Sequence, residues 1–306
     1  MSEVKSGGDL FPLPEIKGRV LLDEPMSAHT SFKIGGPADI FVTVENVSDL
    51  QAVLKWAEDN SVSAFVLGAG TNLLVSDKGV RGVVISFGCG IGDVFIRGTE
   101  MTVGASAKLA VIVRKALGLG LCGLEGLAGI PGTVGGAICM NAGTPVGCVG
   151  DSLKSVKALT ADNDLVELSA SALGLSYRRS RVREKGLIVL EAVFTLRKED
   201  PENLQSVVGS LLDKRKVNQP AGTGTAGSVF RNPTGVTAGE LLDKAGAKGM
   251  QVGGARVSSK HANWIENTGI ATASDVKELM NKLQALVKEK FDVALEPEIQ
   301  MVGEWK

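Results

Sequence analysis

The feature that most constrains this chain is an uncharged, glycine-rich stretch that runs from residue 126 to residue 150. Eight glycines fall inside it, together with Pro131, Pro145 and Asn141, and few bulky apolar residues accompany them. The stretch is long enough to cross a membrane, but its proline and glycine content excludes a membrane-spanning helix. Glycine loses more backbone freedom on folding than any other residue, so another interaction must offset that loss. Two interpretations stay open: a cradle whose backbone N–H groups hold a phosphate-bearing cofactor, or a tightly packed buried loop.

The overall composition predicts a soluble globular protein. Hydrophobic residues make up 44% and charged residues 22% of the 306 residues, a length that allows two domains of ordinary size. The 39 glycines cluster without a three-residue period, which excludes collagen. Aromatic residues make up only 4%, and the net charge is −1. We therefore expect neither a nucleic acid nor a membrane among the partners.

Cysteine and histidine usage argues against a metal site. No two cysteines form a CxxC pair, and the chain has only two histidines. These residues are Cys89, Cys122, Cys139, Cys148, His29 and His261. We expect no metal, and we interpret the cysteines as small buried apolar residues in a reducing compartment.

The N-terminal residues lack the apolar segment of a signal peptide. Residues 1–14 contain glycine and proline instead, and we expect residues 1–24 to form a disordered lead-in. We expect a cytoplasmic protein, and a plastid location reached through a removed transit peptide stays open.

Apolar periodicity predicts a mixture of helices and strands. The expected helices cover residues 48–60, 109–117, 200–216, 238–245 and 274–291, the first opened by a capping box at Ser48–Gln51. The expected strands cover residues 64–67, 80–87, 95–103, 187–196 and 295–301, with a hairpin at 155–168. Because strands and helices do not alternate regularly, the α+β class is expected. A domain boundary is expected near residues 199–205.

A second glycine-containing segment follows the strand expected at 64–67. Gly68-Ala69-Gly70-Thr71-Asn72-Leu73 suggests a dinucleotide fingerprint, but the third glycine is missing and no amphipathic helix follows. A Rossmann fold is therefore excluded. The segment can still bring backbone N–H groups close to phosphate oxygens, and its alternative interpretation is a tight turn between strands.

These segments resemble a known family. Residues 130–137, Ile-Pro-Gly-Thr-Val-Gly-Gly-Ala, together with Asn141-Ala142-Gly143, resemble the flavin-binding signature of the UDP-N-acetylenolpyruvoylglucosamine reductase (MurB) family. That family belongs to the vanillyl-alcohol-oxidase-type, or PCMH-type, FAD superfamily. Four further segments agree in the family's order, at residues 30–38, 67–74, 226–233 and 295–300. The resemblance therefore covers nearly the whole chain after residue 25.

The resemblance implies a fold, a cofactor and a reaction. It implies a two-lobed FAD-binding PCMH-type domain at residues 25–203 and a smaller α+β substrate-binding domain at residues 204–306. It implies UDP-N-acetylmuramate dehydrogenase activity, with non-covalent FAD and with NADPH as co-substrate, in peptidoglycan precursor synthesis. The FAD-binding positions that it implies are Gly68, Ala69, Gly70, Thr71, Asn72, Leu73, Ile130, Pro131, Gly132, Thr133, Gly135, Gly136, Ala137, Asn141, Ala142 and Gly143.

Three residues match the family's catalytic positions: Arg178, Ser228 and Glu298. The implied mechanism passes hydride through flavin N5, takes a proton from Ser228 and stabilises an enolate with Arg178 and Glu298. Without the resemblance, these would be a solvated arginine, a turn serine and an exposed acidic strand edge. Gln300 stands where relatives often carry arginine.

Further residues are candidates for substrate contact: Tyr177, Arg215, Lys216, Arg231, Asn232 and Lys260. Tyr177 is the single tyrosine, and residues 190–220 hold no spare insertion, so the chain resembles the family type that lacks a tyrosine-bearing loop. His29 is expected to be a polar loop residue, and His261 a structural or substrate-adjacent one.

Two other functions stay open from the residues alone. One is an oxidase of the same superfamily, although such enzymes often tether flavin through a histidine that these loops lack. The other is a non-catalytic flavin-binding module, which the three matched catalytic positions argue against. We expect the protein to act as a monomer on small-molecule substrates.

Overall fold

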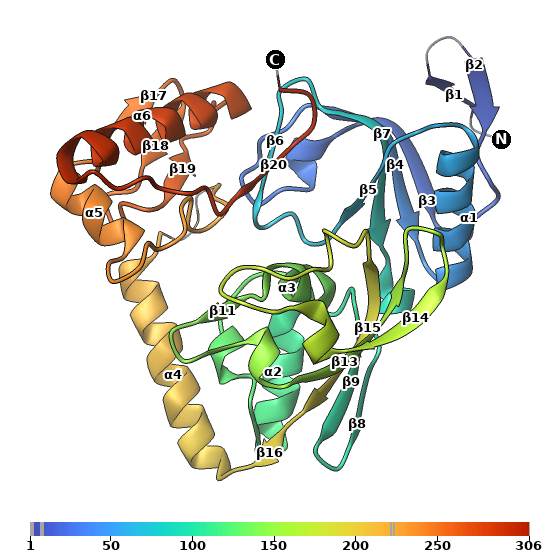
Figure 1. Ribbon diagram of the computed structural model, residues 1–306, viewed down its shortest axis with the longest axis horizontal. Coiled ribbons are helices and arrows are strands. Elements are labelled where there is room, and N and C mark those ends of the chain that lie inside the picture. The colour runs from blue at the N-terminus through green and yellow to red at the C-terminus, as the bar shows by residue number, and fades with distance from the viewer. Residues whose placement is uncertain (1–2, 7–8, 221, 223, 306) are drawn as a thin grey trace. The chain divides into compact units, whose positions relative to one another are not determined.

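The computed structural model describes residues 3–6, 9–220, 222 and 224–305, and the chain divides into two compact units (Figure 1). Unit 1 comprises Met1–Leu21, Ile40–Gly68 and Gly82–Lys214. Unit 2 comprises Leu22–Asp39, Ala69–Arg81 and Arg215–Lys306. Unit 2 is thus assembled from three separate chain segments. The domain limits expected at residues 24/25 and 203/204 stay a prediction, and residues 1, 2, 7 and 8 of the expected lead-in lie outside the described residues.

Unit 1 contains a five-stranded antiparallel sheet (Figure 1). Its strands, in spatial order, are β14 (Leu165–Ser169), β13 (Leu153–Leu159), β15 (Ile188–Thr195), β9 (Glu100–Gly104) and β8 (Val94–Arg97). The hairpin expected at 155–168 is confirmed as β13 and β14. The single strand expected at 95–103 is wrong, because Gly98 takes a positive φ of 63° and turns the chain back as the hairpin β8–β9.

Two helices complete the core of unit 1. Helices α2 (Leu109–Gly118) and α3 (Val134–Met140) contribute Ile112 and Ile138 to one apolar cluster with Val156 and Ala192 of the sheet. Helix α2 begins and ends almost where the apolar periodicity predicts. Helix α3 lies inside the glycine-rich stretch, where only irregular backbone was expected, and that expectation is wrong.

A second sheet of four strands has the order β3 (Arg19–Pro25), β4 (Pro37–Val44), β7 (Val80–Phe87) and β5 (Ala64–Leu67). Strand β5 pairs parallel with β7, and both were expected at these residues. Helix α1 (Val47–Asp59) connects β4 to β5. Its N-cap is Asn46, whose side chain accepts a hydrogen bond from the Asp49 N–H at 2.8 Å, so the capping box expected at Ser48 is wrong.

Six short strands also belong to unit 1. They are β1 (Glu3–Ser6), β2 (Asp9–Pro12), β10 (Leu121–Cys122), β11 (Gly143–Thr144), β12 (Gly147–Cys148) and β16 (Arg197–Lys198). Helix α4 (Pro201–Asn218) begins with the proline that suits a first helical turn, as expected.

In unit 2, two helices and three short strands share one apolar core. Helices α5 (Ala238–Ala245) and α6 (Ala273–Phe291) share an apolar core with β17 (Gln251–Val252), β18 (Ala255–Val257) and β19 (Ile265–Asn267). Strand β6 (Leu73–Val75) pairs parallel with β20 (Gln300–Val302). Both helices occur where the sequence predicts them.

The strand expected at 295–301 is mostly wrong. Only its last residues belong to β20, and Pro297 makes an isolated bridge with Phe230. Leu295 and Ile299 are buried, four residues apart, while Pro297 and Met301 are exposed. The segment is therefore irregular backbone held by its two buried side chains.

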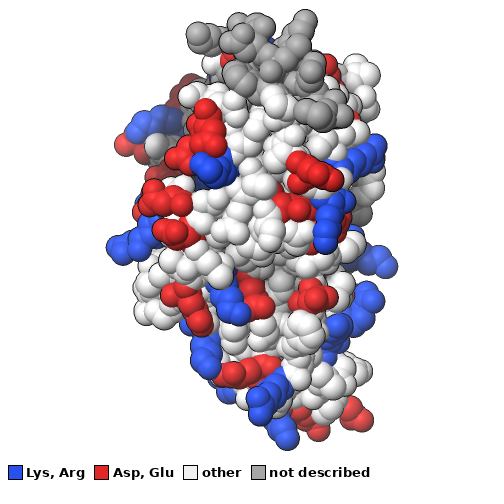
Figure 2. All heavy atoms as spheres, turned by 90° about the vertical axis from the view of Figure 1, so that its right-hand side faces the viewer, with Lys and Arg blue, Asp and Glu red and all other residues white. Residues whose placement is uncertain are grey.

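Charged side chains of both signs occur together on the surface. Figure 2 shows acidic and basic side chains intermixed over one face of the molecule. Among the described residues, no helix is both long and apolar enough to span a membrane.

The N-terminus of α6 has an additional cap from a distant part of the chain. The Asp77 carboxylate accepts hydrogen bonds from the Ala273 N–H at 2.7 Å, the Ser274 N–H at 2.9 Å and the Ser274 hydroxyl at 2.6 Å. Thr272 and Asp275 form a capping box at the same terminus. Asp77 thereby ties the segment after β6 to the longest helix of unit 2.

We expect Asp77→Ala to lower the free energy of unfolding by about 1–2 kcal/mol, because two helix N–H groups lose an ionised acceptor. Urea unfolding followed by circular dichroism measures this change. Asp59→Ala is the matched control, because Asp59 pairs only with the exposed Lys55 on its own helix, and it should leave the midpoint nearly unchanged. Equal midpoints for the two variants would contradict the role given to Asp77.

Candidate functional site

The two glycine-containing segments meet within unit 1 at Gly68. A side chain added there would begin 3.0 Å from the Thr133 hydroxyl and 3.8 Å from the Gly136 Cα. Gly68 and Gly136 are both exposed. Because neither residue carries a side chain, their backbone stays accessible over a surface that a Cβ would fill. This is the arrangement that a flat, phosphate-bearing ligand needs for close approach to a backbone.

The glycine-rich stretch is neither wholly a packed loop nor wholly an open cradle. Val134 and Ile138 of α3 are fully buried, whereas Gly129, Pro131 and Gly136 are exposed. Thr133 caps α3, and its hydroxyl accepts a hydrogen bond from the Gly136 N–H at 3.4 Å. One side of the helix thus anchors the stretch in the core. The other side presents the exposed Gly136, whereas Gly135 lies against Ala105, whose Cβ is 3.1 Å from where a Gly135 Cβ would stand.

The remainder of the first segment lies in unit 2. Gly70 is buried with a positive φ of 63°, and a side chain there would collide with the His29 carbonyl at 2.0 Å. The Gly70 carbonyl accepts a hydrogen bond from the Ser31 N–H at 3.0 Å. The turn at Gly70 therefore has a structural requirement of its own, in addition to any ligand.

Arg178 lies in a tight turn of unit 1. Its backbone takes a positive φ of 54°, which is unfavourable for a side-chain-bearing residue. Its guanidinium donates a hydrogen bond to the Gly143 carbonyl at 2.7 Å and lies 5.1 Å from the Tyr177 ring centre. The structure thus brings Arg178 to the end of the predicted FAD-binding segment. It does not leave Arg178 in a solvated basic cluster.

Ser228 and Glu298 lie near each other in unit 2. The Glu298 N–H donates to the Val229 carbonyl at 2.7 Å, next to Ser228. Asn72 flanks Glu298 from the other side: its side-chain amide donates to the Glu298 carbonyl at 3.1 Å, and its own carbonyl accepts from the Gln300 N–H at 2.9 Å. A predicted FAD-binding residue therefore holds the backbone of a predicted catalytic one.

A buried asparagine that the sequence reasoning missed supports Ser228. Asn263 bonds the backbone of Phe230 through both polar atoms, accepting at 2.9 Å and donating at 2.8 Å, and its carbonyl accepts from the Val229 N–H at 2.8 Å. Its partners lie more than 30 residues away in sequence, so no local pattern reveals it. A polar residue beside two apolar ones, Ala262 and Trp264, was the only available signal.

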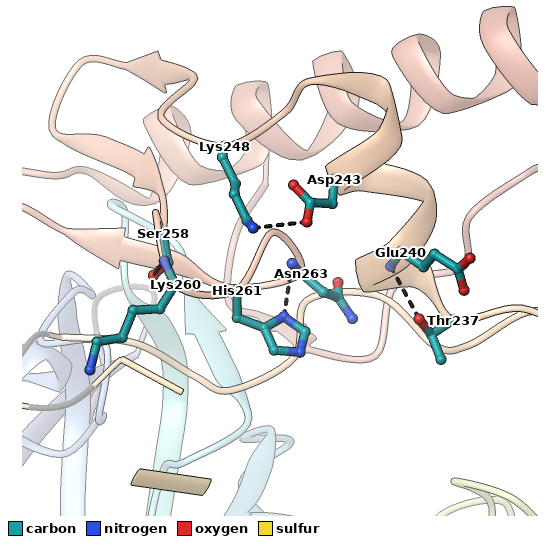
Figure 3. Close-up of polar contacts among 8 residues, drawn as sticks. All are labelled: Thr237, Glu240, Asp243, Lys248, Ser258, Lys260, His261 and Asn263. Atoms are coloured by element: carbon teal, nitrogen blue, oxygen red, sulfur yellow. Dashed lines mark hydrogen bonds and ion pairs between the residues drawn. The ribbon is translucent and has the colours of Figure 1, made fainter. Parts of the chain in front are cut away.

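The candidate substrate contacts are dispersed. Arg231 pairs with Glu296 at 3.4 Å, and the Asn232 side chain accepts from the Ala238 N–H at 3.0 Å at the start of α5. Burial lowers the pKa of Arg215, whereas Lys216 and Tyr177 are exposed. Lys260 is exposed, and Figure 3 shows its side chain extending away from His261. Their roles stay predictions.

His261 is half-buried beside α5 (Figure 3). Its Nδ1 accepts a hydrogen bond from the Asn263 N–H at 3.2 Å, so the neutral ring carries its proton on Nε2. Burial, followed by the charge of Lys248, holds the pKa of His261 below its usual value of 6.5. Lys248 in turn pairs with Asp243 at 2.8 Å. His261 is thus held in the neutral form within a packed polar cluster.

The cysteines are not uniformly buried, which corrects the sequence-based interpretation. Cys89 is exposed and Cys122 is buried, and all four cysteines are free. Burial raises the pKa of the Cys139 thiol to about 11, so that thiol is protonated at neutral pH. Among the residues that the structure describes, no cluster of three or more His, Cys, Asp or Glu side chains is placed to hold a metal ion.

Comparisons with known proteins match both parts of the chain. A family model described as "UDP-N-acetylenolpyruvoylglucosamine reductase, C-terminal domain" matches residues 219–302. A second, described as "FAD binding domain", matches residues 38–169. A UDP-N-acetylenolpyruvoylglucosamine reductase of Desulforamulus reducens is 42% identical over 289 residues, covering 94% of this chain and 95% of that protein. The protein of that name from Caldanaerobacter subterraneus subsp. tengcongensis is 43% identical, with the same coverage.

A solved structure agrees with the sequence comparisons. The crystal structure of UDP-N-acetylenolpyruvylglucosamine reductase from Thermus caldophilus superposes with a TM-score of 0.81 at 35% sequence identity. The match covers 94% of this chain and 100% of that one. The resemblance drawn from the motifs and the α+β class are both confirmed.

We expect Gly70→Ala to be much more costly than Gly98→Ala. Both glycines have a φ of 63°, but a Cβ at Gly98 meets nothing within 4 Å, whereas one at Gly70 meets the His29 carbonyl. Gly98→Ala should cost about 1 kcal/mol of stability from its backbone conformation alone. Gly70→Ala should cost more than about twice that, measured by urea unfolding. Similar losses for the two variants would show that the collision at His29 is relieved easily.

We expect His261 to make the protein less stable in mild acid. Its folded pKa is depressed, so the unfolded state takes up the proton first, and stability falls as the pH drops from about 7 through the folded pKa. His261→Asn keeps an acceptor for the Asn263 N–H and removes the titrating group. Its unfolding free energy should therefore decline less than that of the wild type between about pH 7.5 and about pH 5. Parallel declines would assign the acid sensitivity to other groups.

Proposed function

Because the chain belongs to the UDP-N-acetylenolpyruvoylglucosamine reductase family, we propose that it reduces the enolpyruvyl group of UDP-N-acetylenolpyruvoylglucosamine to form UDP-N-acetylmuramate, a precursor of peptidoglycan. NADPH is the reductant and FAD the cofactor. The observation that carries this proposal is the hydrogen bond that the Arg178 guanidinium donates to the Gly143 carbonyl, at the end of the predicted FAD-binding segment. A residue with a family-matched catalytic role thus lies where the family's cofactor signature ends.

The chain supplies a fitting surface for FAD. Bound FAD supplies the redox chemistry, taking up electrons from NADPH and delivering them to the substrate double bond. Gly68, Thr133 and Gly136 would hold it by close backbone approach, as their mutual distances allow. We propose that the binding is non-covalent, because His29 already bonds Glu24 at 2.8 Å and His261 accepts a hydrogen bond from the Asn263 N–H at 3.2 Å.

Arg178 would stabilise the charge that develops during reduction. Addition of hydride to the terminal carbon of the enolpyruvyl double bond moves an electron pair toward the substrate carboxylate. A guanidinium already fixed by a hydrogen bond stabilises that charge without first having to be ordered. The positive φ of Arg178 fits this role, because strained backbone is kept where the surrounding structure requires it.

We assign the remaining roles in the reaction to Ser228 and Glu298. The adjacent substrate carbon needs one proton to balance the added hydride, and Ser228 is the residue that we assign as its donor. The Glu298 N–H donates a hydrogen bond to the Val229 carbonyl next to Ser228, so the backbones of the two residues are held near each other. Glu298 would act on the same developing charge through its carboxyl group. We further propose that the enzyme works as a monomer in the cytoplasm.

We expect Ser228→Ala to separate the two halves of the reaction. NADPH should still bleach the flavin absorbance at a rate near that of the wild type, because no proton is delivered to the substrate in that half. Reoxidation by UDP-N-acetylenolpyruvoylglucosamine should slow by about 100-fold or more. Stopped-flow absorbance of the flavin measures both rates.

Normal reoxidation in Ser228→Ala would contradict the role assigned to Ser228 but not the proposed reductase activity. The activity itself has a separate test in the wild type. NADPH oxidation that needs no enolpyruvyl substrate, or oxygen uptake without NADPH, would contradict the proposed reductase and favour an oxidase.

A further inference from the structure

Asn141 joins the predicted FAD-binding segment to the turn that carries Arg178. Its side-chain amide donates a hydrogen bond to the Ser176 carbonyl at 2.9 Å, and its side-chain oxygen accepts one from the Gly150 N–H at 2.9 Å. The residue is 5% exposed. One buried side chain therefore joins two points of the glycine-rich stretch to Ser176, which lies 35 residues further along the chain.

The orientation of this side chain is unambiguous on chemical grounds. A backbone carbonyl can only accept and a backbone N–H can only donate, so the amide nitrogen must face Ser176 and the oxygen must face Gly150. Both polar atoms of Asn141 are thus engaged by protein backbone. The amide nitrogen is directed at the Arg178 turn, and the oxygen is directed at Gly150.

The turn that Asn141 holds is strained and otherwise small. Ser176 and Arg179 exchange hydrogen bonds of 3.0 Å and 3.1 Å between their backbones, and Arg178 lies between them with its positive φ. Such a conformation persists only when its surroundings impose it. The contact from Asn141 fixes one end of the turn, and the bond from Arg178 to Gly143 fixes its side chain.

The backbone of Asn141 contributes as well. It is the C-cap of α3 in the left-handed conformation, with φ 42° and ψ 55°, a geometry that asparagine tolerates better than most residues. The chain then reaches Gly143 two residues later. The same residue therefore ends the helix, directs the chain toward the Gly143 carbonyl and holds the Arg178 turn.

We propose that Asn141 is a positioning residue for Arg178 and does not contact the cofactor through its side chain. The inference rests on the proposed function, in which Arg178 acts on the substrate. It revises the expectation that Asn141 belongs to the FAD-binding set. Loss of its two hydrogen bonds would let the Arg178 turn shift, and small shifts of a catalytic group are costly in rate.

The test uses Asn141→Gly in the FAD-loaded full-length protein. Glycine keeps the left-handed backbone without strain and removes both side-chain hydrogen bonds. Asn163→Gly is the matched control, because Asn163 is also left-handed, at φ 64°, and its side chain also bonds a distant backbone, at Gln51. It lies in the β13–β14 turn of the same unit.

Stopped-flow measurements should separate positioning from cofactor binding. In Asn141→Gly, flavin reduction by NADPH should stay within about twofold of the wild type, while reoxidation by UDP-N-acetylenolpyruvoylglucosamine slows by about 10- to 100-fold. Asn163→Gly should match the wild type in both. Loss of FAD or a changed flavin spectrum in Asn141→Gly alone would overturn the proposal, because Asn141 would then be a cofactor contact.

A double-mutant cycle with Arg178→Ala tests the coupling. If Asn141 acts through Arg178, then adding Asn141→Gly to Arg178→Ala should slow reoxidation by less than about threefold further. Independent, multiplying effects would overturn the proposal. Asn141→Asp keeps the acceptor for Gly150 and loses the donor to Ser176, so it should slow reoxidation as well. Failure of both Asn141 variants to fold, with Asn163→Gly intact, would also overturn the proposal by making Asn141 a folding residue.

The outcome is distinguishable from a failure of the proposed function. A wild type that does not turn over the enolpyruvyl substrate would remove the function itself. A wild type that does so, with Arg178→Ala unaffected in reoxidation, would remove the role of Arg178. Normal reoxidation in Asn141→Gly beside a slow Arg178→Ala removes the role of Asn141 and leaves that of Arg178.

Discussion

Hydrogen bonds from asparagine side chains to loop backbone hold each proposed catalytic residue in place. Asn141 bonds the turn of Arg178, Asn72 bonds the carbonyl of Glu298, and Asn263 bonds Phe230 beside Ser228. Irregular backbone lacks the regular partners of helices and strands, so its buried N–H and C=O groups need other ones. An amide side chain offers a donor and an acceptor at once, and a loop bonded in this way has few conformations left.

The apolar cores provide the fixed points for these bonds. In unit 1, α3 buries Val134 and Ile138 in the same apolar cluster as the five-stranded sheet, while its Gly136 stays exposed. In unit 2, α6 packs one apolar stripe into the core and is capped by Asp77. The exposed Gly136 thus belongs to a helix that is anchored in the core of unit 1. A bound cofactor can therefore meet backbone that is already ordered, which lowers the entropic cost of binding.

Regular elements with strong periodicity were predictable, and those that depend on distant partners were not. The apolar spacing in α2, α5 and α6 marks their bounds closely, and the hairpin β13–β14 follows from its Asp162-Asn163 turn. The capping box at Ser48 was wrong because Asn46 is the better acceptor two residues earlier. The strand predicted at 295–301 was wrong because Leu295 and Ile299, two of its alternating apolar residues, are buried in irregular backbone. Pairing with β6 begins only at Gln300.

The sequence by itself determined the family, the cofactor class and the identity of the candidate catalytic residues, because these depend on short motifs whose residue types carry the information. Only the tertiary structure showed that Gly68 faces Thr133, that Arg178 bonds Gly143, and that Asn141 serves the Arg178 turn. These contacts join residues that lie 35 or more positions apart. No local pattern encodes them, because loop closure over such distances is decided by the packing of the whole unit. The glycine-rich stretch illustrates the difference: its composition predicted accessible backbone, and only the structure showed that helix α3 lies inside it with Gly136 exposed.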